Sequence, residues 1–229
     1  MAAIANVNNQ VGRMPRPAVP HEHINYAALT PYSPYISAWS EESDAPTPVI
    51  ERPGRGIGYL DETVHDRDRN GVLWLRAFSR PGEGQPLFAK VHPLRQRRAM
   101  RRLLCNVCAG PAHRTADGVL WLLKDHRDDW PGWPEQMAVT EPPVCLPCVR
   151  LATRLCPALR RAGAAAVRVR NAPVSGVHGT QFRCDGGLPA AMDEITVAYG
   201  DPRLRWMRAA KLVRELWDCT IVPLEQLTR

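Results

Sequence analysis

Two cysteine pairs, Cys105-Asn-Val-Cys108 and Cys145-Leu-Pro-Cys148, enclose the stretch of sequence that decides the fold. Two residues between the cysteines of a pair let both sulfur atoms face one point across a tight turn. Two such turns brought together place four thiolates in a tetrahedron, which is the geometry that Zn²⁺ prefers. The spacing therefore predicts a zinc site whose ligands are Cys105, Cys108, Cys145 and Cys148. Because four protein sulfurs leave no open coordination position, the predicted site is structural and not catalytic.

The segment between the two pairs predicts a hairpin followed by a helix. The Asp117-Gly118 turn precedes an apolar run at 119–123, which is typical of a β-hairpin. The second pair opens a predicted helix over 145–159, with Pro147 in its first turn. This order of knuckle, hairpin and ligand-bearing helix resembles the treble-clef class of zinc fingers across about a fifth of the chain. The resemblance implies a tetrahedral zinc at the four cysteines but no particular function.

Two other interpretations of the cysteines stay open. The second pair, at a helix start, also resembles a thioredoxin-type redox dithiol, although that leaves the first pair unexplained. Alternatively, the thiols are incidental, as we expect for Cys156, Cys184 and Cys219. Residues 1–10 are polar and lack the apolar core of a secretory signal, and no apolar run approaches membrane-spanning length. We therefore expect a cytoplasmic protein without membrane contact, and in a reducing compartment paired cysteines favour metal over disulfides.

The composition is basic and rich in arginine. The formal net charge is +7, and of the 30 basic residues only Lys90, Lys124 and Lys211 are lysines. With many alanines and prolines, this bias is typical of a high-GC genome. The chain as a whole resembles proteins of high-GC actinobacteria that have no assigned activity. The resemblance implies no function, whereas the basic balance permits nucleic acid or another acidic partner.

A basic helix is predicted at 93–104, directly before the first cysteine pair. At 100° per residue, one face carries Gln96, Ala99, Met100, Leu103 and Leu104. The other face carries Arg95, Arg97, Arg98, Arg101 and Arg102. Five arginines on one face can bind phosphates without reading a base sequence. The simpler alternative is a solvated helix face in an arginine-rich protein.

The Asp125-His126 pair suggests a sharper alternative. HNH nucleases often place an Asp-His pair on a treble-clef hairpin between two Cys-x-x-Cys pairs, and this segment resembles that arrangement. The resemblance implies His126 as general base and Asp125 as a Mg²⁺ ligand. The segment departs from the family pattern because no Asn stands at the middle position, where Gln136 is a weak substitute. No His or Asn follows Cys148 either. A divergent metal-dependent nuclease is therefore the second hypothesis.

The chain divides into four predicted regions of an α+β protein. They are a disordered proline-rich arm at 1–46, a β-hairpin region at 47–104, a zinc module at 105–160 and a β/α region at 161–229. The last region contains a predicted helix that starts at Asp201-Pro202 and carries Trp206, Ala209 and Val213 on one side. We expect ordered structure to begin near Thr47.

Two further patterns bear on the hairpins. Gly71-Val-Leu-Trp-Leu75 recurs as Gly118-Val-Leu-Trp-Leu122, which suggests two similar hairpins on one sheet or one core. Asp66-Arg-Asp-Arg-Asn-Gly71 copies the opening of a calcium loop. Its twelfth position is Ala77 where calcium needs a bidentate Glu, so a hairpin turn is predicted instead.

Taken together, these patterns predict a non-enzymatic, zinc-stabilised binding or regulatory protein that meets nucleic acid or an acidic protein through the basic helix. The nuclease, a thiol–disulfide protein and a module that only binds protein are the alternatives. The sequence contains no phosphate loop, nucleophile elbow or dinucleotide fingerprint.

Overall fold

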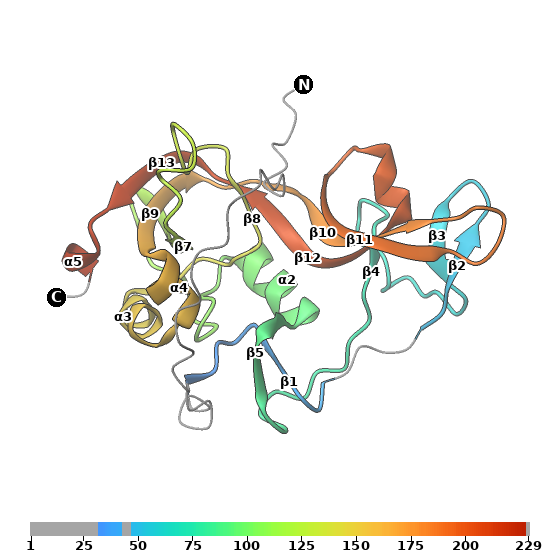
Figure 1. Ribbon diagram of the computed structural model, residues 1–229, viewed down its shortest axis with the longest axis horizontal. Helices are drawn as coiled ribbons and strands as arrows, with labels where there is room; N and C mark the ends of the chain where they lie inside the picture. Colours follow the sequence, from blue (N-terminus) through green and yellow to red (C-terminus); the bar gives the residue numbers. More distant parts are fainter. Residues whose placement is uncertain (1–31, 43–46, 228–229) are drawn as a thin grey trace, which may run out of the picture.

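The computed structural model describes residues 32–42 and 47–227, in which short helices accompany four β-sheets (Figure 1). This arrangement confirms the predicted α+β class. Most of the predicted disordered arm lies outside the described residues. The part that is described contains a strand, β1 (Ser37–Trp39), which pairs with β5 (Pro86–Val91). The predicted start of order near Thr47 is therefore wrong, because the chain already pairs with a distant strand at Ser37.

Two chain segments run side by side through the whole molecule. The first consists of β9 (Ala164–Asn171) and β10 (Val174–Arg183), and the second of β12 (Met207–Glu215) and β13 (Trp217–Val222). β9 pairs with β13, and β10 pairs with β12, both antiparallel. The same register continues across the break between strands, so the four strands form one long ribbon shared by two sheets (Figure 1).

Five further strands complete the two sheets on this ribbon. The sheet through β10 and β12 gains β11 (Ala190–Ala198), β4 (Leu73–Trp74) and β8 (Ala138–Val139). The sheet through β9 and β13 gains β7 (Gly118–Lys124) and β6 (Arg114–Thr115). A separate hairpin consists of β2 (Val49–Arg52) and β3 (Gly56–Tyr59).

The predicted helix from Asp201 is wrong beyond its first turns. Asp201 does cap a helix, because its carboxylate accepts a hydrogen bond from the Arg203 N–H. That helix is a single 3₁₀ segment, η2 (Pro202–Trp206), and the chain then continues as strand β12. In the strand, Met207 and Ala209 lie on one buried side, whereas the predicted helix face grouped Ala209 with Trp206 and Val213. Pairing with β10 satisfies the backbone of β12, and local spacing cannot reveal this partner.

The four described helices are short. They are α2 (Pro93–Arg102), α3 (Leu146–Leu155), α4 (Pro157–Ala162) and α5 (Leu224–Leu227). The predicted helix over 145–159 is divided at Cys156, which precedes Pro157 and has an extended backbone. None of the helices within the described residues has the length and apolar character needed to cross a membrane.

The largest hydrophobic core joins three of the predicted regions. It contains Trp74 and Met100 from 47–104, Trp121 from 105–160 and Leu212 from 161–229. Trp74 and Trp121 belong to the two copies of the repeated pentapeptide. The two copies therefore lie in different sheets but pack on one core. A shared core was one of the two arrangements that the repeat predicted.

Helix α2 is fixed to β12 by a buried glutamine. The Gln96 side-chain amide donates to the Leu212 carbonyl at 2.9 Å, and its oxygen accepts from the Leu212 N–H at 2.9 Å. Gln96 thus pairs with the β12 backbone in the way that a neighbouring strand would. The buried Arg214 guanidinium donates to the Met100 carbonyl in the last turn of α2 at 2.9 Å. These contacts determine which face of α2 remains for solvent.

The turn that copies a calcium loop is a hairpin turn, as predicted. Both oxygens of Asp68 are occupied, because one accepts from the Val72 N–H and the other from the Trp74 indole and the Tyr199 hydroxyl. Asp66 is paired with Arg76 at 2.6 Å. These carboxylates are therefore committed to donors of the protein.

Candidate metal centre and basic helix

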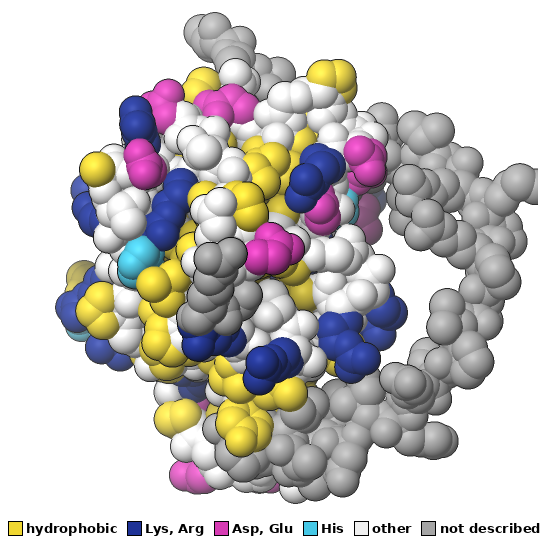
Figure 2. Space-filling view, turned by 90° about the vertical axis from the view of Figure 1, so that its left-hand side faces the viewer, with side chains coloured by type: hydrophobic (Ala, Val, Ile, Leu, Met, Phe, Trp, Pro, Cys, Tyr) yellow, Lys and Arg dark blue, Asp and Glu magenta, His cyan; other side chains and the backbone are white. Residues whose placement is uncertain are grey.

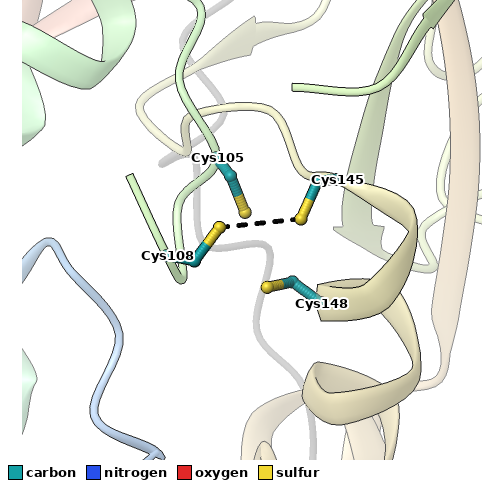
Figure 3. A group of neighbouring side chains, drawn as sticks. All are labelled: Cys105, Cys108, Cys145 and Cys148. Carbon is teal, nitrogen blue, oxygen red and sulfur yellow. Dashed lines mark hydrogen bonds between the residues drawn. The ribbon is translucent and has the colours of Figure 1, made fainter. Parts of the chain in front are cut away.

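Four cysteine side chains meet at one point. The sulfur atoms of Cys105, Cys108, Cys145 and Cys148 all lie within 4.8 Å of one another. Figure 3 shows them directed toward a common centre between the knuckle and the first turn of α3. The Cys108 and Cys145 sulfurs are 3.7 Å apart. A tetrahedron with Zn–S bonds of about 2.3 Å has edges of about 3.8 Å, so this spacing fits a metal ion. All four residues are free cysteines, not disulfides.

The first pair is shaped by a knuckle of backbone hydrogen bonds. The Cys105 N–H donates to the Gly110 carbonyl at 2.7 Å, and the Ala109 N–H donates to the Cys105 carbonyl at 3.0 Å. Ala109 has a left-handed backbone, with φ of 60°. The Val107 N–H also points at the Cys105 sulfur, 3.4 Å away.

The second pair is held against the knuckle by the chain that precedes α3. Cys145 caps the N-terminus of α3, and Cys148 lies in its first turn. The Asn106 N–H donates to Pro143 at 2.8 Å, and the Val144 N–H donates to Leu120 on β7 at 2.8 Å. Two segments that are distant in sequence are therefore already joined around the cluster. The order observed is knuckle, β6–β7 hairpin and helix α3.

The two halves of the cluster differ in exposure. Cys105 and Cys148 are buried in a second hydrophobic core with Leu120, Val149 and Ala166, whereas Cys108 is exposed. This core packs one side of the cluster, with Cys105 and Cys148, against β7 and β9, whereas Cys108 lies at the surface and Cys145 is partly buried.

The thiols of α3 need a cation to ionise. Burial raises the pKa of Cys145 to about 11, and burial together with the neighbouring thiols also raises the pKa of Cys148. For Cys108, burial acts against ionisation, but the Gly110 N–H and the neighbouring thiols outweigh it and lower the pKa. A divalent cation would supply the positive charge that allows all four sulfurs to ligate as thiolates. The donor set therefore fits a bound metal ion.

Two of the five arginines predicted on the exposed face of α2 are buried or half-buried against other parts of the protein. Arg95 is buried, so its predicted exposure is wrong. Its guanidinium binds both oxygens of Glu42, at 2.5 and 2.6 Å, and the Ser37 carbonyl at 2.7 Å. Arg97 is half-buried and stacks on the Trp74 ring, 4.1 Å from its centroid. The α2 surface that an external partner can reach therefore carries fewer than the five predicted arginines.

Arg98, Arg101 and Arg102 are exposed at the end of α2. The Arg98 guanidinium lies 3.0 Å from the Tyr35 hydroxyl. Within 32–42 and 47–227, no carboxylate forms an ion pair with any of these three side chains. They are followed directly by Leu103 and Leu104 and then by the knuckle, so the positive charge lies next to the cysteine cluster.

The Asp125-His126 pair lies on an exposed loop after β7. Asp125 is bound by Arg127 at 2.8 Å, and the His126 ring lies 2.7 Å from Asp129. The arginine lowers the pKa of Asp125. In the part of the chain that the structure describes, no group of three metal-binding side chains forms around His126. The geometry thus offers no support to the nuclease hypothesis.

The three remaining cysteines lie outside the cluster. Cys156 connects α3 to α4, Cys184 contacts Glu51 and Cys219 lies near Glu135. Two further side chains, Glu42 and Gln96, have structural roles that the sequence does not reveal, because their partners are distant along the chain. The one signal in the sequence was that Gln96 shares its predicted helix face with apolar residues, which indicates that Gln96 is buried.

Four cysteines are thus placed to bind a metal ion. Comparisons with protein-family models, with curated proteins and with solved structures found no match to this chain.

Proposed function

We propose that the four cysteines bind one structural Zn²⁺ in a treble-clef arrangement. The observation that carries the proposal is the convergence of four sulfurs within 4.8 Å from two segments far apart in sequence. Four-sulfur tetrahedral sites suit zinc or iron–sulfur chemistry, and a single ion with a sulfur spacing of 3.7 Å suits zinc. The order of knuckle, hairpin and helix supports the treble-clef form. When bound, the ion would cross-link the knuckle to α3 and neutralise the thiolates.

Elemental analysis tests this proposal directly. Protein purified without a metal-affinity tag is expected to contain about one zinc per chain. A colourless protein would also distinguish zinc from iron. If the protein contains no metal and its thiols are alkylated only after reduction, the zinc proposal fails and the thiol–disulfide alternative replaces it.

We further propose that the exposed end of α2 binds the backbone of a nucleic acid. Arg98, Arg101 and Arg102 support this role, because they are solvent-exposed and carry charge that no described carboxylate neutralises. The cysteine cluster that follows α2 would fix the end of the helix. Guanidinium groups on one turn of helix suit phosphate contacts, which give affinity without base specificity. We propose that the protein works in a reducing compartment such as the cytoplasm, where cysteines that bind a metal ion stay reduced.

Neutralising these three arginines is expected to weaken nucleic-acid binding by about 100-fold near physiological salt. Each lost phosphate contact should reduce the salt slope, d log K/d log[salt], by about 0.9, hence by about 3 for the triple Arg98→Gln, Arg101→Gln, Arg102→Gln variant. Fluorescence anisotropy with labelled duplex DNA and RNA at several salt concentrations measures both quantities.

A charge-matched control is available on α3 and α4. Arg154, Arg160 and Arg161 are also exposed. Figure 2 shows the left-hand side of the molecule as drawn in Figure 1, where acidic, basic and apolar side chains are mixed. Their conversion to glutamine removes the same charge and should change the affinity only a few-fold. Equal losses in the two triple variants would mean that net charge alone drives binding. Absence of any binding by the native protein would favour the module that binds only protein.

A further inference from the structure

A continuous set of contacts leads from α2 to a cleft beside η2. Arg97 on α2 stacks on Trp74, and the Trp74 indole donates to Asp68 at 3.1 Å. The Tyr199 hydroxyl donates to the same carboxylate at 3.0 Å. Gly200, the next residue, lines the cleft. Arg101 lies close enough to influence both Arg97 and Tyr199 electrostatically. The basic end of α2 thus lies near Tyr199, the residue that directly precedes Gly200 of the cleft.

The cleft lies between two turns and has a volume of about 420 Å³. One wall is the Asn70-Gly71 turn, and the other is formed by Gly200, Leu204 and Arg205. A Cβ atom added at Gly71 or Gly200 would meet nothing within 4 Å, so both walls are open to an approaching group. The rest of the lining consists of Asp201 and Pro202, so Arg205 is the only cationic side chain among the residues that line the cleft.

Two opposite charges line the cleft, the Asp201 carboxylate and the Arg205 guanidinium, and they differ in their partners. Asp201 also lines it, but its carboxylate is bound by the Arg203 guanidinium at 2.7 Å. Asp68, behind the Asn70 wall, accepts hydrogen bonds from Trp74 and Tyr199. Arg205 is exposed, and no carboxylate within 32–42 or 47–227 forms an ion pair with it. An unneutralised guanidinium at an open cleft is a suitable contact for a phosphate.

We propose that a nucleic-acid backbone bound on α2 continues into this cleft, where Arg205 contacts a further phosphate. This inference rests on the function proposed for α2. It also specifies how the strand is recognised. Trp74 is covered by Arg97 and is 3 % exposed, and Tyr199 is half-buried with its hydroxyl bonded to Asp68. Trp74 is therefore not available to stack on a base, and the proposed contact of Arg205 is to a phosphate, which makes it independent of sequence.

The test compares Arg205→Gln with Arg160→Gln, which removes the same charge from α4. At about 150 mM salt, Arg205→Gln should raise Kd about fivefold for each of two unrelated duplexes, and the salt slope should fall by about 0.9. Arg160→Gln should leave the slope unchanged. Arg205→Lys keeps the charge and should retain the native slope, which separates a phosphate contact from a structural role of the arginine.

The outcomes separate the two proposals. If the native protein binds neither duplex, or if the α2 triple variant binds as tightly as the native protein, the proposed function itself fails. If the α2 triple variant loses binding while Arg205→Gln keeps the native slope, only the extension into the cleft is overturned. A fivefold effect confined to one of the duplexes would also overturn it, because a phosphate contact cannot distinguish sequences.

Discussion

Replacement of Cys148 by serine is expected to release the metal ion and to destabilise the protein by more than about 4 kcal/mol. Cys148 is buried with Leu120, Val149 and Ala166, so the variant loses a ligand and also buries an unpaired hydroxyl. Structural zinc supplies about 10–16 kcal/mol of apparent binding energy in zinc-finger peptides, which is comparable to the whole stability of a domain. Urea unfolding followed by tryptophan fluorescence measures the loss, and elemental analysis measures the released zinc.

Cys156→Ser is the matched control for this experiment. Cys156 lies eight residues further along the same helical region, outside the cluster, and its backbone has the extended conformation of an N-cap. Serine is a favoured N-cap residue, so this change should keep the zinc and alter stability by less than about 0.5 kcal/mol. If Cys148→Ser were as stable as Cys156→Ser, and a chelator left the native protein unaffected, the cluster would not be a structural metal site.

The cysteine cluster could be predicted from the sequence because its geometry is mostly local. Each pair needs only one tight turn, and the Asp117-Gly118 signal correctly placed a hairpin between the pairs. Helix α2 was also predictable, because Gln96, Ala99 and Met100 recur at helical spacing and form the buried face of the helix. Helix α2 and each cysteine pair are thus encoded within one local segment, whereas the meeting of the two pairs was inferred from the spacing that zinc sites use.

Features that depend on distant partners could not be predicted in this way. Arg95 looked like its neighbours on the helix, and its burial depends on Glu42, which lies 53 residues earlier in a segment expected to be disordered. β12 looked helical, because the pairing with β10 that decides its conformation has no local signal. The number of arginines free to bind a partner was therefore overestimated, and the cleft at Arg205 was not anticipated.

The Glu42–Arg95 pair has the second large expected effect. Both side chains are buried, and Glu42 also accepts hydrogen bonds from the Trp39 and Arg80 N–H groups. Glu42→Gln should destabilise the protein by about 3–5 kcal/mol, because it leaves the Arg95 guanidinium buried without a counter-charge. Arg95→Met should cost a similar amount. The double variant should recover part of the loss, and a double-mutant cycle by urea unfolding measures the coupling. Strict additivity of the two losses would show that the pair is not coupled.

Acid titration gives an independent test of the same pair. Burial alone would raise the pKa of Glu42, but the hydrogen bonds from Arg95, Trp39 and Arg80 outweigh it and lower the pKa from 4.5 to about 2. A lowered pKa means that the folded protein binds this proton less readily than the unfolded chain. The stabilisation, about 3 kcal/mol, is therefore fully present above about pH 5 and is lost as the pH falls toward 2.

Protonation of other paired carboxylates, such as Asp66 with Arg76, destabilises the native protein and the Glu42→Gln variant alike. The difference in unfolding free energy between the native protein and Glu42→Gln isolates Glu42, and it should shrink by about 3 kcal/mol between pH 5 and pH 2. A difference independent of pH would mean that Glu42 has no lowered pKa in the folded protein, and that the pair does not hold β1 against α2 as an ion pair.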